Sequence, residues 1–158
     1  MASLNVEIVE LKEKVVYGLW KQSNDKTISN DIDTLSEEYY NTICSTKGMV
    51  LPYIVLSRNY DETSKDFEMF IGSTIENNGL KSFTLPAGKY AKVTIKPKLG
   101  LFWGASIGEA KRYFYIKWLP TSQYQGMNME YEFHTEKSKD KHPTIDIIFA
   151  IKEKNWKC

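Results

Sequence analysis

The chain has 158 residues, a length that fits one domain, and 42% of them are hydrophobic, which is enough for a core and excludes a wholly disordered protein. It carries 21 Lys and Arg against 20 Asp and Glu, and this net charge of +1 argues against a surface devoted to nucleic acid. No apolar run approaches the roughly 20 residues of a membrane span, and the N-terminus lacks the apolar stretch of a signal peptide, so we expect a cytoplasmic protein that does not contact a membrane.

The motifs of metal, nucleotide and hydrolase sites are missing. Cys44 and Cys158 form no CxxC pair, and His134 and His142 are separated by a charged loop with no cysteine nearby. There is no GxGxxG, Walker or GxSxG motif, and the glycines between 100 and 108 are interrupted by bulky side chains where a phosphate needs bare backbone. We therefore expect no metal and no other cofactor.

Alternating apolar residues predict strands, and apolar residues three or four apart predict helices. In the first half we expect two strands joined by a turn, a polar loop over 21–30, a helix and two further strands. The helix is expected to start with Asn30 or Asp31 as its N-cap, to run to about Thr46 and to be closed by Lys47-Gly48. The strands of this half are predicted at 6–11, 15–20, 53–56 and 66–71.

The second half follows the same order. After a strand, a Pro-Ala-Gly turn and another strand comes a helix from about Ser106 to Trp118, closed by Leu119-Pro120. The strands of this half are predicted at 82–85, 90–96, 128–135 and 144–151.

Residues also repeat between the halves. Positions 74 apart match, such as Leu11 with Leu85 and Tyr39-Tyr40 with Tyr113-Phe114, although coincidence among apolar positions is the alternative explanation. We predict one domain over 1–158, with an internal repeat of about 4–78 and 80–154. Because each half is too small to be stable alone, we expect the two halves to share one sheet or core. The expected fold class is α+β, with antiparallel sheets that carry two main helices on one face. The other face is expected to be covered by the partner half or to line a groove between the halves.

One strand of the second half carries an acidic face. In residues 129–134, Met129, Tyr131 and Phe133 alternate with Glu130, Glu132 and His134. We expect the apolar set to pack under the helix and the polar set to face solvent or the groove. Two interpretations stay open: the glutamates are ordinary solvated positions, or a carboxylate lies in an aromatic groove, where it would bind a cation.

The aromatic residues, 13% of the chain, are candidates for lining such a groove. Trp20 at a strand end and Trp103 before the second helix are equally compatible with packing and with groove lining. Tyr39 and Tyr113 share helix faces with Leu35 and Ala110, which favours the core. The candidate ligand-binding residues are Glu132, His134, Trp20, Trp103, Tyr17 and Tyr113.

An ordered set of motifs resembles the GyrI-like small-molecule-binding family, which includes the effector-binding domains of AraC-type and MerR-type multidrug-responsive transcription factors. The resemblance covers essentially the whole chain and rests on Leu85–Tyr90, Ile107–Ala110, Tyr113-Phe114, Trp118–Pro120, Glu132, Ile145–Ile147 and Ile151-Lys152. It implies tandem βαββ units around a groove for amphipathic, often aromatic and cationic compounds. It also implies a buried glutamate at the base, matched here by Glu132, with His134 where the family usually has tyrosine.

The resemblance leaves several functions open. The first is a free-standing binding module, without a DNA-binding element, that captures hydrophobic or cationic compounds as a sink, a sensor or an accessory to a partner protein. The second is a hydrolase of electrophilic toxic molecules, in which Glu132 would activate water. The third is inhibition of a macromolecular target such as a topoisomerase. Direct binding to nucleic acid is not expected.

Overall fold

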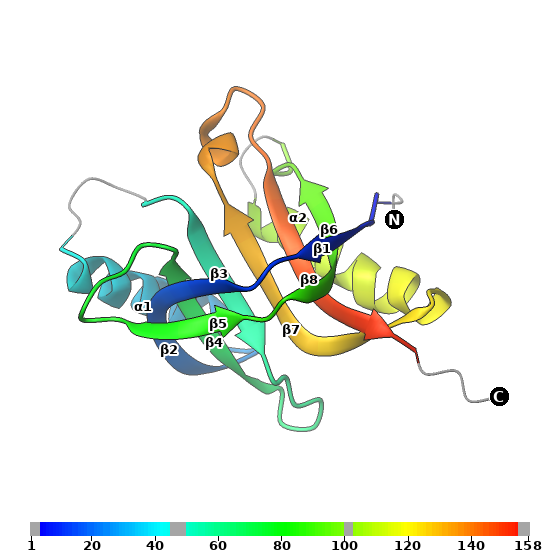
Figure 1. Cartoon of the computed structure of the whole chain (residues 1–158), viewed down its shortest axis with the longest axis horizontal. Helices are drawn as coiled ribbons and strands as arrows, with labels where there is room; N and C mark the ends of the chain where they lie inside the picture. The colour runs from blue at the N-terminus through cyan, green and yellow to red at the C-terminus, as the bar shows by residue number, and fades with distance from the viewer. Residues whose placement is uncertain (1–3, 45–49, 100–102, 155–158) are drawn as a thin grey trace.

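The computed structural model describes residues 4–44, 50–99 and 103–154, which form one eight-stranded antiparallel sheet and two main helices (Figure 1). The expected order of elements is confirmed, since a βαββ unit occurs twice, as β2-α1-β3-β4 and β6-α2-β7-β8, each preceded by one more strand. The elements are β1 (Glu7–Leu11), β2 (Lys14–Asn24), α1 (Ile28–Thr42), β3 (Tyr53–Arg58), β4 (Asp66–Ser73), β5 (Lys81–Leu85), β6 (Gly88–Ile95), α2 (Trp103–Arg112), the π-helix η1 (Tyr113–Trp118), the short 3-10 helices η2 (Leu119–Thr121) and η3 (Glu136–Lys139), β7 (Tyr124–His134) and β8 (Ile145–Glu153).

The strands follow the order β1-β6-β8-β7-β3-β4-β2-β5. Read from either end, equivalent strands of the two halves occur in the same order, since β1-β6-β8-β7 corresponds to β5-β2-β4-β3. The two units meet where β7 pairs with β3, in the middle of the sheet. The first strand of each half is exchanged: β1 pairs with β6 of the second half, and β5 pairs with β2 of the first. The sheet is therefore shared, and neither half has all of its strands paired within itself.

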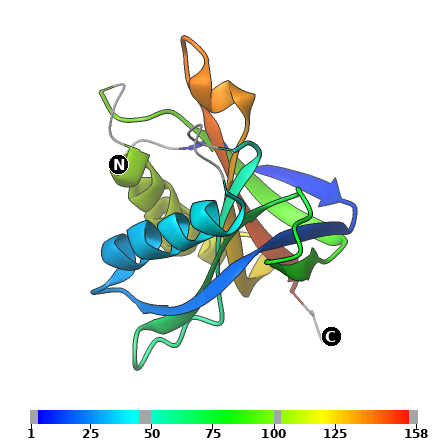
Figure 2. The same ribbon diagram turned by 90° about the vertical axis from the view of Figure 1, so that its left-hand side faces the viewer.

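Both helices lie on the same side of the sheet, as Figure 2 shows. Register explains why, because cross-strand partners share a face. Val55 on β3 is opposite Glu132 on β7, which is opposite Ile147 on β8. Val55 belongs to the core under α1 and Ile147 to the core under α2. Glu132 and the other β7 side chains on this face therefore lie between the two helices.

The other face of the sheet is also buried, and this corrects one expectation. Tyr131 packs with Phe70, Leu85 and Tyr90, and Met129 and Phe133 pack at the margin of this cluster. These residues face away from the helices, because the sheet curls until its outer strands cover its inner face. The polar residues of β7 are the ones on the helix side.

The start of α1 differs from the predicted loop and cap. β2 continues to Asn24, and the helix begins at Ile28 with Thr27 in the N-cap position. Asp31 lies inside the first turn, where its carboxylate accepts hydrogen bonds of 2.7 Å from the hydroxyls of Thr27 and Ser23. The helix ends at Thr42 rather than near Thr46, and Lys47-Gly48 lies outside the described residues.

The second helix starts earlier than predicted, at Trp103, and changes to a π-helix over its last six residues. Phe114 is fully buried, and its ring stacks on Phe149 of β8 at a centroid distance of 3.8 Å. Trp118 stacks on Phe114 and on Tyr124 at 5.3 and 6.1 Å. The aromatic contacts tie the π-helix to the sheet. Among the described residues, no helix has the length and apolar character that crossing a membrane requires.

Candidate functional site

A row of polar side chains on β7 occupies the centre of the molecule between the helices. Glu130, Glu132 and His134 are opposite Ser57, Val55 and Tyr53 of β3, so one half supplies charge and the other does not. Glu132 and His134 are each 8% exposed, and the Glu130 side chain is 15% exposed. The interpretation of the glutamates as solvated strand positions is therefore wrong.

A pocket of about 850 Å³ opens beside this row. One wall comes from the second helical segment and from β7, with Lys111, Arg112, Tyr115, Ile116, Leu119, Gly126, Asn128 and Glu130. The opposite wall comes from the start of α1, the β3–β4 connection and the adjoining strands, with Asp25, Ile28, Ser57, Tyr60, Glu62 and Phe67. The volume is in the range that holds a drug-sized molecule.

An irregularity in β7 shapes the pocket's edge. The register between β7 and β8 shifts between Gly126 and Glu130, and Asn128 has a φ of 55°. The Asn128 side chain accepts a hydrogen bond from the Tyr60 backbone N–H at 2.8 Å and donates one to the Tyr60 carbonyl at 3.0 Å. The bulge thereby fixes the β3–β4 connection against β7 and holds Tyr60 at the pocket wall.

Of the three acids that line this pocket, Asp25 and Glu62 are exposed, whereas Glu130 is largely buried. Its Oε2 atom is buried and has no hydrogen-bond partner among the described residues, and the Lys111 ammonium lies 3.8 Å away. Burial raises the pKa of Glu130, while the Lys111 charge and the Tyr115 hydroxyl act in the opposite direction and Glu132 adds to the rise. A carboxylate in this position favours a positively charged neighbour.

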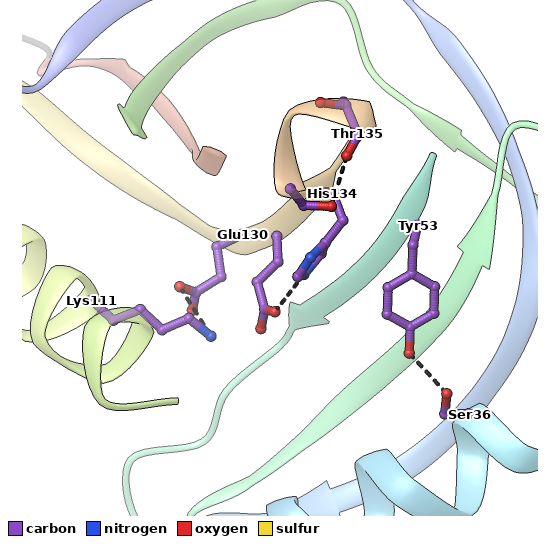
Figure 3. A network of polar contacts seen from close by, with 8 residues as sticks. Ser36, Tyr53, Lys111, Glu130, His134 and Thr135 are labelled. Atoms are coloured by element: carbon purple, nitrogen blue, oxygen red, sulfur yellow. Dashed lines mark hydrogen bonds and ion pairs between the residues drawn. The ribbon is translucent and has the colours of Figure 1, made fainter. Parts of the chain in front are cut away.

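Lys111 and Tyr115 come from the helical segment, one turn apart, and flank Glu130. Burial by itself would lower the pKa of Lys111, but Glu130 and Glu132 outweigh it and raise the pKa, so the ammonium is retained. Burial also raises the pKa of the Tyr115 hydroxyl, and the adjacent Glu130 charge adds to this effect. Figure 3 shows the Lys111 side chain reaching from the helix toward Glu130.

Glu132 and His134 form a second contact further along β7. The His134 Nε2 and Glu132 Oε1 atoms are 3.2 Å apart. The rings of Tyr53 and Trp103 pack against the His134 ring in T-shaped arrangements, at centroid distances of 5.5 and 6.5 Å. The Tyr53 hydroxyl is hydrogen-bonded to Ser36 at 3.0 Å, and burial raises the pKa of Tyr53 to about 12. These contacts orient the imidazole beside the carboxylate.

Of the six residues predicted from sequence, the structure brings Glu132, His134 and Trp103 together. Trp20 lies on the other face of the sheet, against Phe70 and Phe83, with the Arg58 guanidinium 4.2 Å from its ring centroid. Tyr17 is half-buried at the far end of β2, where that strand pairs with β4 and β5.

Tyr113 is half-buried at the start of the π-helix rather than in the core, because Phe114, one turn after Ala110, takes the core position. Sequence analysis selected Glu132 rather than Glu130 as the groove carboxylate, and it did not identify Lys111, Tyr115 or Tyr60 as site residues. Lys111 could have been noticed as a cation beside the apolar stripe of a predicted helix. No group of three or more His, Cys, Asp or Glu side chains within the described ranges is arranged to hold a metal ion.

Comparison with known proteins identifies a matching family and solved structures with a similar fold. The sequence profile of a family described as integron-associated effector binding protein matches residues 7–151. An integron cassette protein from the mobile metagenome of Vibrio cholerae has a similar structure, with a TM-score of 0.64 at 17% identity over 93% of this chain and 95% of that one. No curated protein matches the chain.

Two further solved structures share the fold. A putative transcription regulation protein from Staphylococcus aureus MU50 has a TM-score of 0.68 at 11% identity, over 95% of this chain and 99% of the other. SAV2435, solved with bound tetraphenylphosphonium, has a TM-score of 0.66 at 12% identity over 94% of each chain. At these identities the likeness shows the fold.

Proposed function

Because the chain belongs to the integron-associated effector binding protein family, we propose that it binds amphipathic, aromatic and often cationic small molecules in the groove between α1 and α2, with the buried glutamates of β7 at its base. The observation that carries this proposal is the Glu130 Oε2 atom, which is buried beside a pocket of about 850 Å³ and accepts no hydrogen bond from the described residues. A ligand cation would add to the charge compensation that the Lys111 ammonium provides at 3.8 Å.

The pocket walls fit the apolar part of such a ligand. Tyr60 and Phe67 lie on one side, and Tyr115 and Ile116 on the other. Aromatic faces near a carboxylate attract a cation through the ring quadrupole, an interaction worth about 0.5–2 kcal/mol. Walls of this kind recognise shape and charge with few directional contacts, which suits recognition of several related compounds.

Glu132, His134 and Trp103 extend the proposed site along β7. Glu132 lies one alternate position beyond Glu130 on the same face and acts on the same lysine. We propose Glu132 as the second carboxylate of the base, with His134 as its neighbour. Contact between a ligand and Trp20, Tyr17 or Tyr113 stays a prediction.

The alternative function is hydrolysis of an electrophile. One observation favours it, namely that Glu130 is a carboxyl whose pKa is raised by burial, as a general base requires. The effector-binding family favours binding without turnover. Incubation of the protein with reactive electrophiles such as epoxides, followed by mass spectrometry of the small molecules, separates the two functions.

Calorimetry with two ions of one shape tests the binding proposal. Tetraphenylphosphonium is a monocation and tetraphenylborate an anion of nearly identical geometry. We expect Glu130→Gln and Glu132→Gln to weaken binding of the cation by about 1–3 kcal/mol in sum, the size of a screened charge–charge attraction, roughly ten- to hundred-fold, and to strengthen binding of the anion. Glu136→Gln, at an exposed position after β7, is the matched control.

Two results would contradict the proposal. If the wild-type protein and both variants bind the cation equally well, neither glutamate contributes to the site. If neither ion binds the wild-type protein, the groove is not a site for amphipathic ions.

A further inference from the structure

Lys111 is an unusual feature for a groove built around buried carboxylates. Its side chain lines the same pocket as Glu130, is 25% exposed, and places the ammonium 3.8 Å from Glu130 Oε2. A cationic ligand attracted by Glu130 would enter a space that already holds a positive charge from the chain itself.

The contact between Lys111 and Glu130 is longer than several ion pairs at the surface, although Lys21 and Asp31 are 3.9 Å apart. Lys89 contacts Glu153 at 2.7 Å, and Arg58 contacts Glu68 at 2.8 Å. At 3.8 Å the Lys111 ammonium compensates part of the Glu130 charge but is too far away to donate a hydrogen bond to Oε2. That oxygen has no hydrogen-bond donor among the described residues. The carboxylate therefore keeps an open acceptor while its charge is partly compensated.

The lysine side chain has the properties of a displaceable group. It is a flexible four-carbon stem with a strongly hydrated head, so it exchanges partners for water more readily than an arginine fork does. It is anchored on α2 near the junction with η1, and part of it already reaches solvent. The ammonium can leave Glu130 without any movement of the helix.

We propose that Lys111 is the residue that sets the charge selectivity of the groove: it is a tethered cation that competes with cationic ligands for Glu130 and Glu132. This inference rests on the proposed function. A cationic ligand contacts the carboxylates of Glu130 and Glu132 only when it displaces the Lys111 ammonium. Lys111 consequently lowers affinity for cations and gives amphipathic anions a partner in the same groove.

The test uses tetraphenylphosphonium and tetraphenylborate with the Lys111→Met protein, which keeps the length and apolar stem of the side chain and removes its charge. We expect the cation to bind Lys111→Met at least about ten-fold more tightly than wild type, and the anion to bind several-fold more weakly. Lys111→Arg keeps the positive charge, so it should prefer the same one of the two ions as the wild-type protein does. Lys117→Met, at an exposed position of η1, is the control for loss of a helix charge and should bind both ions as wild type does.

The outcomes separate this inference from the proposed function. Equal cation affinity in wild type and Lys111→Met, with a loss in Glu130→Gln, would leave the groove proposal intact and overturn the role of Lys111. Weaker cation binding in Lys111→Met would also overturn it, since the lysine would then support the site. If the cation binds no variant, both proposals fail. Should Lys111→Met not fold, Lys111→Gln gives the same comparison, and NMR of the Lys111 ammonium in wild type must show its release when tetraphenylphosphonium binds.

Discussion

Removal of the Lys111 charge should destabilise the fold more than removal of the Glu130 charge, although the two groups are partners. In Lys111→Met, Glu130 and Glu132 remain as two largely buried carboxylates on one strand face, without the ammonium that acts on both. In Glu130→Gln, Lys111 keeps Glu132, and the lost carboxylate is one whose pKa is already raised by burial. The asymmetry follows from two acids sharing one base.

The separation of 3.8 Å corresponds to about 4 kcal/mol of attraction at an effective dielectric constant of about 20. The side chains are 25% and 15% exposed, so water screens part of this energy. We expect a loss of about 1–3 kcal/mol in the free energy of unfolding for Lys111→Met, below the range for a fully buried pair, and under about 1 kcal/mol for Glu130→Gln.

Urea denaturation at pH 7.5 and pH 5.5 measures both variants. A carboxyl whose pKa is raised in the folded state binds more protons there than in the unfolded chain, so stability falls as pH rises from the ordinary pKa to the raised one. The loss in Lys111→Met should therefore shrink at pH 5.5. A larger loss in Glu130→Gln, or a loss in Lys111→Met that does not change with pH, would refute the reasoning.

Three further predictions concern the core, the sheet and the site. Phe114→Ala removes a fully buried ring stacked on Phe149 and should cost about 3–5 kcal/mol in urea denaturation; a loss below 1 kcal/mol would show that the π-helix is not held by this contact. Gly72→Ala would place a Cβ 2.2 Å from the Tyr17 carbonyl oxygen, so we expect a loss of about 1–3 kcal/mol, visible as a lower Tm, and an unchanged Tm would contradict the close approach of β2 and β4. Tetraphenylphosphonium should bind more tightly as pH rises through the raised pKa of Glu130, which faces Lys111, Tyr115 and Glu132; calorimetric affinity that falls with pH would exclude Glu130 as the partner.

The order of elements could be predicted from the sequence because each strand and helix has its own period. Which face of each strand lies against the helices could not be predicted. Alternation along β7 shows that Glu130, Glu132 and His134 share a face, but it does not show which face meets the helices, since the curled sheet buries Tyr131 on the opposite side as well. A sheet buried on both faces gives no solvent side to decide the matter.

The sequence drew attention to the acidic face of β7, but it selected Glu132 for the groove, whereas Glu130 lines the pocket, and it did not identify the lysine beside Glu130. The glutamates stand out on a strand of otherwise apolar residues, whereas Lys111 and Tyr115 lie in a helix rich in charged and aromatic side chains, where a lysine at the margin is common. The π-helix adds to the difficulty, because it changes which side chains point to the sheet after Arg112. Contact between Lys111 and Glu130 depends on the packing of α2 over β7, which no local pattern encodes.

The exchange of β1 and β5 between the halves has a consequence for how such a groove can become selective. Two identical halves, each a βαββ unit with its preceding strand, would form a dimer if they exchanged that preceding strand. Its two-fold axis would pass between the two central strands, and every residue near that axis would occur twice. Joined in one chain, the units differ: β7 presents carboxylates where β3 presents Tyr53, Val55 and Ser57. Covalent linkage releases the groove from symmetry, so that an asymmetric ligand can meet carboxylates on β7 and uncharged side chains on β3.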